Sequence, residues 1–144
     1  MATITSNYVD HTTSSMTKVS RVTQTLRITY ALLPILAGLD KFAHLLTDWN
    51  KYLAPIVTNI IPISPGMFMN IVGVIEIVAG IIVFIKPKLG SLIVGMWLLA
   101  IAINLILAGQ FFDVAVRDVI MAIGAFCLYT LLDDERNVDQ TPNR

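Results

Sequence analysis

The chain has few charged residues: Lys, Arg, Asp and Glu make up 14% of its 144 residues, whereas apolar residues make up 56%. An ordinary soluble domain carries about 25% charged residues, so this chain has too little polar surface for a water-soluble monomer. Its mean hydropathy is +0.73. The ten basic and ten acidic residues cancel, which leaves no basic footprint for a nucleic acid. The composition predicts a membrane protein of one domain.

Cysteine and histidine are also scarce. The single cysteine, Cys127, excludes an internal disulfide framework and a cysteine-rich zinc or iron–sulfur cluster. The two histidines, His11 and His44, are too few and too far apart for a two-histidine haem site within one chain. No nucleotide-binding, serine-hydrolase or zinc-protease motif occurs. We therefore expect neither a metal site nor a covalent cofactor.

Four apolar stretches predict an all-α fold, an integral membrane four-helix antiparallel bundle. They cover residues 28–46, 67–85, 89–109 and 111–132, with 19 to 22 residues each. A helix of that length is about 28–33 Å long, which matches a hydrocarbon core of about 30 Å. The second and third stretches are followed by very short loops, so the last three helices must be antiparallel neighbours.

Polar segments flank this membrane domain, which we assign to residues 27–132. Residues 1–26 are rich in Ser and Thr and predict a flexible tail, with an amphipathic helix over its final part, residues 18–27. The tail lacks the apolar core of a cleaved signal, so we expect the first apolar stretch to direct insertion. Residues 133–144 predict a second polar tail in solvent.

The basic residues predict the orientation in the membrane. Seven of the ten lie on the N-terminal side of the membrane, namely Lys18, Arg21, Arg27, Lys86, Lys88, Arg136 and Arg144. The positive-inside rule then places both termini in the cytoplasm and the loop 47–66 outside. That loop contains Trp49, Tyr52 and three prolines. Such a composition predicts an interfacial segment between the first two membrane helices.

Polar residues within the spans gather in the outer half of the predicted bundle. Inserting a charged side chain into a membrane span costs about 2.5–3.5 kcal/mol of free energy on insertion scales, so we expect each one to have a structural or functional role. Helical spacing places Asp40, Lys41 and His44 on one face of the first helix, and Asn70 and Glu76 on one face of the second. The predicted ligand-binding residues are Asp40, Lys41, His44, Asn70, Glu76, Asn104, Arg117 and Asp118. We expect Glu76 to form the floor of the site and, as the deepest carboxyl, to be protonated.

Three interpretations of these residues stay open: a structural role, transport, and ligand binding or proton handling. In a structural role the residues would hold the helices in register without any chemistry, and Asn70 and Asn104 suit that role well. His44 fits an interfacial, hydrogen-bonded histidine better than a metal ligand. A transporter component would need an opening on the inner side, yet the cytoplasmic half of these helices has almost no polar residue. The cost of buried charge favours binding or proton handling for Lys41, Glu76 and Arg117.

Short motifs along the membrane domain resemble those of a known family. They are Arg27, Gly38 and Lys41 in RITYALLPILAGLDKFAHLL, Gly73, Glu76 and Gly80 in IVGVIEIVAGIIVFI, the following KPKLG, and Arg117–Asp118. On these residues the chain resembles the DoxX-like family of small four-helix bacterial membrane proteins, over residues 27–132. That family includes a subunit associated with terminal quinol oxidase and a protein similar to the small subunit of thiosulfate:quinone oxidoreductase.

The resemblance implies a multi-pass protein of the bacterial cytoplasmic membrane. It implies an accessory subunit of a redox complex, with other membrane or redox subunits, or further copies of this chain, as partners. Quinone is the ligand that it favours for an outward-facing pocket. Lys41 and Arg117 would then hold a carbonyl or anionic oxygen, and Glu76 or Asp118 would exchange a proton. The chain lacks a haem ligand pair, a flavin motif and a cysteine pair, so we do not expect catalysis by this chain alone.

Overall fold

The computed structural model describes the backbone of residues 2–139 and the side-chain surroundings of residues 17–133. The described part of the chain has helices and no strands, with four long helices: α1 (Ala2–Ala43), α3 (Pro65–Ile85), α4 (Pro87–Ala108) and α5 (Phe112–Asp139). A short 3-10 helix, η1 (Trp49–Tyr52), and a short helix, α2 (Pro55–Ile60), connect α1 to α3. All four long helices contain a segment long and apolar enough to cross a membrane. This confirms the predicted all-α, four-helix membrane bundle.

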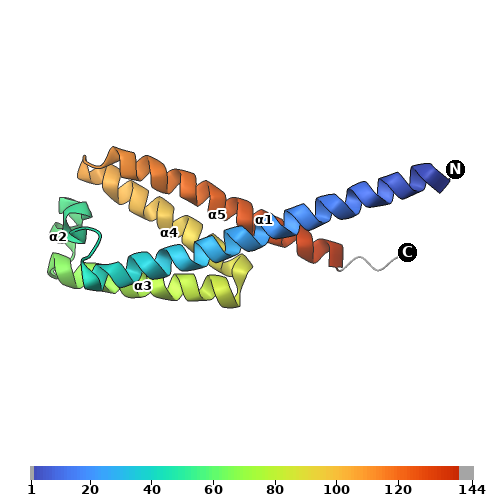
Figure 1. Cartoon of the computed structure of the whole chain (residues 1–144). Helices are drawn as coiled ribbons and strands as arrows, with labels where there is room; N and C mark the ends of the chain where they lie inside the picture. Colours follow the sequence, from blue (N-terminus) through green and yellow to red (C-terminus); the bar gives the residue numbers. More distant parts are fainter. Residues whose placement is uncertain (1, 140–144) are drawn as a thin grey trace.

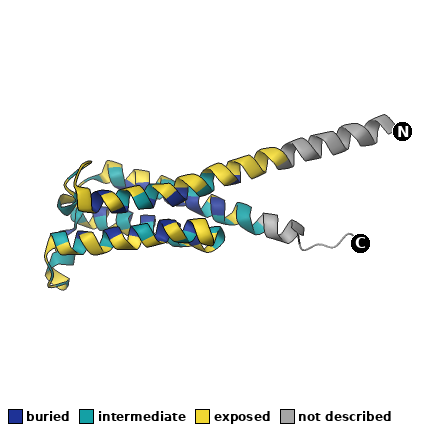
Figure 2. Cartoon of the chain, turned by 60° about the horizontal axis from the view of Figure 1, so that its bottom comes forward, coloured by how far each residue is buried: buried dark blue, intermediate teal, exposed yellow. Residues whose placement is uncertain are grey.

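The four long helices form two pairs. α1 packs mainly against α3, and α4 packs mainly against α5, while α3 and α4 also touch (Figure 1). α1 begins and α5 ends at the same end of the bundle (Figure 1), as an even number of spans requires. Large apolar side chains are exposed along the outer faces, and the buried residues lie between the helices (Figure 2). A surface of that kind suits contact with lipid.

Residues at the helix ends explain where α3 and α4 begin and where α4 ends. α3 and α4 each begin two residues before the predicted start, because Pro65 and Pro87 occupy the first helical position, where the missing N–H costs nothing. The Ser64 side chain accepts a hydrogen bond from the Met67 N–H and caps α3. α4 ends at Ala108, and the next residue, Gly109, has a φ of 68°, in the left-handed region that favours glycine.

α1 and α5 extend beyond the apolar stretches that were predicted for them. α1 begins at Ala2 rather than at residue 28, and α5 runs to Asp139 rather than ending at residue 132. The reason is that no Gly or Pro occurs in α1 before Pro34, nor in α5 after Gly124, so no residue there breaks the helix. The flexibility predicted for the two tails stays a prediction.

The two halves of the bundle differ in packing. In the half near the α3–α4 turn, buried side chains from all four long helices fill the interior, and all but Tyr30 are aliphatic: Tyr30, Ala31, Ala79, Val83, Val94, Leu98, Ala122, Ala125 and Leu128. The Tyr30 hydroxyl donates to the Met121 carbonyl at 2.6 Å and ties α1 to α5. The other half lies beneath the segment with η1 and α2 (Figure 1), and it contains a cavity.

Candidate functional site

The cavity lies between the two helix pairs and has a volume of about 750 Å³. α1, α3, α4 and α5 all line it, and residues of the α1–α3 connection, including Trp49, Tyr52 and Val57, line it as well. Most of its wall is apolar. Five of the eight predicted site residues also line it: Lys41, Glu76, Asn104, Arg117 and Asp118. The structure therefore brings these five to one cavity from α1, α3, α4 and α5.

Close packing of two glycines sets the separation of α1 and α3. A Cβ atom added to Gly38 would lie 2.5 Å from the Gly73 carbonyl oxygen, and one added to Gly73 would lie 2.8 Å from the Gly38 carbonyl oxygen. Side chains at these positions would push the two helices apart. Lys41 and Glu76 each lie one turn after one of these glycines. The glycine contact therefore holds the two charged residues within reach of each other.

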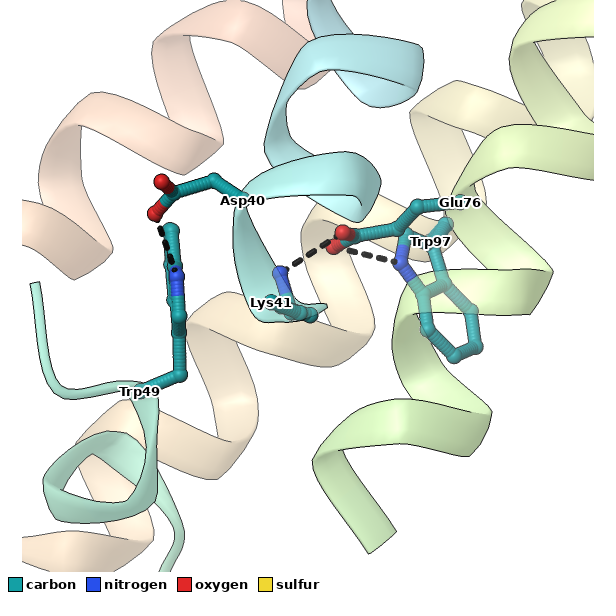
Figure 3. A network of polar contacts seen from close by, with 5 residues as sticks. All are labelled: Asp40, Lys41, Trp49, Glu76 and Trp97. Carbon is teal, nitrogen blue, oxygen red and sulfur yellow. Dashed lines mark hydrogen bonds and ion pairs between the residues drawn. The ribbon is translucent and has the colours of Figure 1, made fainter. Parts of the chain in front are cut away.

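Lys41 and Glu76 form an ion pair inside the bundle (Figure 3). The Lys41 Nζ donates to Glu76 Oε2 at 2.6 Å, and each side chain is only 5% exposed. The Trp97 Nε1 lies 3.5 Å from the other Glu76 oxygen, a long hydrogen bond. The Lys41 ammonium also lies 3.9 Å from the ring centroid of Trp49, within the range of a cation–π contact. Lys41 is thus held by one carboxylate and one aromatic face.

Asp40 anchors the connection that follows α1. Its carboxylate accepts hydrogen bonds from the backbone N–H groups of Leu45 and Leu46, both at 3.0 Å, and from Trp49 Nε1 at 2.7 Å (Figure 3). Asp40 is buried but does not line the cavity. Its bonds orient the Trp49 ring over Lys41. The structure therefore gives Asp40 a positioning role, whereas the sequence predicted that it would meet the ligand.

Asn104 fastens the same connection to α4. Its side-chain nitrogen donates to the Tyr52 carbonyl at 2.7 Å, and its side-chain oxygen accepts from the Ala54 N–H at 3.2 Å. Ala54 is fully buried, so this contact ties the connection to the bundle over the cavity. Asn104 lines the cavity, but both ends of its amide are already bonded within the chain.

Arg117 and Asp118 are neighbours on α5 and both line the cavity. Asp118 is 6% exposed, and within the described part of the chain it has neither a hydrogen bond nor an ion pair. Arg117 is an exposed residue and likewise makes no ion pair with any described residue. The pair supplies the cavity with a buried acceptor and an exposed donor.

The structure does not bring His44 and Asn70 to the cavity. α1 ends at Ala43, and His44 adopts a left-handed φ of 53°, so the helical spacing that grouped it with Asp40 no longer applies. Its Nδ1 lies near the Phe42 carbonyl oxygen, and its side chain is exposed. On α3 the buried stripe passes through Met69, one residue from Asn70 and therefore about 100° around the helix. Asn70 is exposed.

Sequence reasoning missed the tryptophans. Trp49 and Trp97 both line the cavity and both contact the Lys41–Glu76 pair. The position of Trp97 could have identified it as a site residue. It lies near the middle of α4, whereas tryptophans in membrane helices are usually found at the interfaces. A buried indole N–H also needs an acceptor. No comparable signal placed Trp49, whose position depends on the fold of the connection.

The arrangement fits a bound organic molecule. Among the described residues no cluster of three or more His, Cys, Asp or Glu side chains could hold a metal ion. The site instead combines an apolar wall, an internal ion pair and the Arg117–Asp118 pair, a pattern typical of small-molecule pockets. The chain matches no family model, no curated protein and no solved structure, so the resemblance to the DoxX-like family stays a prediction.

Proposed function

We propose that this chain binds a lipophilic small molecule in the cavity beneath the α1–α3 connection. The observation that carries the proposal is a cavity of about 750 Å³ inside a membrane bundle, lined by apolar residues and by the buried charges of Lys41, Glu76 and Asp118. Small-molecule sites have volumes of about 300–1,000 Å³, apolar walls and a few convergent polar groups. Buried charge within a membrane span is also typical of functional sites.

Quinone is the ligand class that we favour. A quinone combines a planar ring with carbonyl oxygens and an apolar tail, which matches an apolar wall with a few polar groups. The Arg117 guanidinium offers five N–H donors to a ring carbonyl and has no ion-pair partner among the described residues. The resemblance to the DoxX-like family points to the same ligand. In this proposal the chain is an accessory subunit of a redox complex in the bacterial cytoplasmic membrane, and it does not catalyse a reaction alone.

One observation favours a second candidate, a purely structural assembly subunit. Lys41 and Asn104 make their contacts within the chain, to Glu76 and to the α1–α3 connection. Such bonds stabilise packing whether or not a ligand binds. This candidate predicts that the chain co-purifies with a larger complex and that the cavity takes up no small molecule.

Tryptophan fluorescence tests the proposal. Trp49 and Trp97 are the two tryptophans of the chain, and both line the cavity. A quinone quenches indole emission at short range, so decylbenzoquinone bound in the cavity would quench both residues. We expect saturable quenching of the detergent-purified protein. Quenching that rises linearly with added quinone would indicate partition into the micelle and would contradict the proposal.

The chain offers a matched pair of control variants on α3. Val72 lines the cavity, whereas Val74 is 52% exposed on the outer face of the same helix. Val72→Phe places a ring in the cavity and should abolish the saturable component. Val74→Phe adds the same ring on the outer face and should leave the binding curve unchanged. Equal binding by the two variants would place the quinone outside the cavity.

A further inference from the structure

Asp118 differs from the other buried charged residues of the bundle. Lys41 and Glu76 neutralise each other, and Asp40 accepts three hydrogen bonds from the α1–α3 connection. Asp118 is equally buried and lines the cavity, yet it has no hydrogen bond or ion pair within the described residues. Its carboxylate oxygens are accessible from the cavity, and a carboxylate only accepts hydrogen bonds. The cavity therefore contains an acceptor that a ligand can satisfy.

The charge balance of the cavity points the same way. Its buried charged side chains are one cation, Lys41, and two carboxylates, Glu76 and Asp118, so their formal sum is −1. Arg117 and Lys41 attract the Asp118 carboxylate, and Glu76 repels it. Arg117 is exposed, whereas Asp118 and Glu76 are buried. No described residue donates a hydrogen bond or forms an ion pair with Asp118, so it remains an acceptor open to a ligand.

We infer that the ligand presents a hydroxyl group to Asp118, so that the cavity binds the hydroquinone form more tightly than the quinone form. This inference rests on the proposed function. An ionised carboxylate only accepts hydrogen bonds. A hydroquinone carries hydroxyl donors on its ring, whereas a quinone carries carbonyl acceptors at the same positions and would face Asp118 oxygen to oxygen. Asp118 is thus the specificity-determining residue for the reduced form.

Isothermal titration calorimetry measures the preference. Decylhydroquinone and decylbenzoquinone are titrated separately into the detergent-purified full chain under anaerobic conditions, and partition of each into empty micelles is subtracted. We expect decylhydroquinone to bind at least about tenfold more tightly, the lower end of what a hydrogen bond to a charged group contributes. The wild-type ratio is informative even if a variant at residue 118 does not fold.

Two variants on α5 assign the preference to one carboxylate. In Asp118→Asn the amide both donates and accepts, so the ratio of the two affinities should fall to within about twofold of one. Asp113→Asn makes the same change at an exposed residue of the same helix that does not line the cavity, and it should retain the wild-type ratio.

The outcomes separate this inference from the proposed function. Equal affinity for the two forms, tighter binding of decylbenzoquinone, or an unchanged ratio in Asp118→Asn would each overturn the inference while leaving a quinone site in the cavity. Failure of both compounds to bind would overturn the proposed function and the inference together. A tenfold preference that disappears only in Asp118→Asn supports the assignment of Asp118 to the hydroxyl group.

Discussion

A double-mutant cycle on Lys41 and Glu76 tests whether the charged residues act as one unit. The two groups are joined at 2.6 Å, with 5% of each side chain exposed. Removing one member of a buried pair leaves an uncompensated charge in a low dielectric and costs about 3–5 kcal/mol. Lys41→Met should lie at the upper end of this range, because Glu76 would retain only the 3.5 Å contact with Trp97.

Glu76→Gln should be the milder change. A glutamine has nearly the same shape as the glutamate and keeps a carbonyl oxygen for the Lys41 ammonium. The Trp49 ring, 3.9 Å away, also continues to stabilise that cation. The double variant Lys41→Met/Glu76→Gln leaves neither charge buried. Its loss of stability should be smaller than the sum of the single losses by about 2 kcal/mol.

Unfolding in mixed detergent micelles, followed by circular dichroism, gives the four free energies. A second cycle on Lys88 and Asp133 is the control, because this ion pair has side chains that are 30% and 44% exposed. Exposed pairs contribute about 0–1 kcal/mol, so its coupling should be small. Additive losses at Lys41 and Glu76 would refute the view that the two residues form one buried unit.

Three further predictions concern topology and packing. A cysteine placed at Ser6 or Asn143 in a cysteine-free background should resist an impermeant thiol reagent added to intact cells, and labelling of either would contradict the cytoplasmic assignment of both termini. Gly38→Ala should destabilise the bundle by about 1–3 kcal/mol, since its Cβ would lie 2.5 Å from a backbone oxygen of α3, whereas Gly66→Ala, with no atom nearer than 3.9 Å, should not. His44→Gly should stabilise the bundle by about 0.5–1 kcal/mol in thermal unfolding, because it relieves a φ of 53°; a loss of stability would show that the left-handed conformation is not strained.

Hydropathy predicted most of the fold because lipid exposure requires long apolar stretches. The predicted second and third helices start within two residues of α3 and α4. The start of α1 and the end of α5 were not predictable in this way. These segments are polar and have no apolar periodicity, and the helices continue through them because no Gly or Pro interrupts them.

The candidate site was partly predictable. Lys41 and Glu76 were identified from the cost of buried charge, and that cost applies wherever the helices pack. Asn70 and His44 were grouped with them by helical spacing, which fails where a residue lies one position off the buried stripe or beyond the helix end. The positioning role of Asp40 depends on how the connection folds back onto α1, and helical periodicity contains no information on that.

Ligand content after purification from native membranes tests directly whether the cavity binds a lipophilic molecule. The wild-type chain, Val72→Phe and Val74→Phe are purified in a mild detergent, and their lipophilic small molecules and bound proteins are quantified by mass spectrometry. We expect the wild-type chain and Val74→Phe to retain a quinone or hydroquinone and Val72→Phe to lose it. A redox subunit that co-purifies without any such molecule, or equal retention by Val72→Phe, would contradict a ligand-binding cavity.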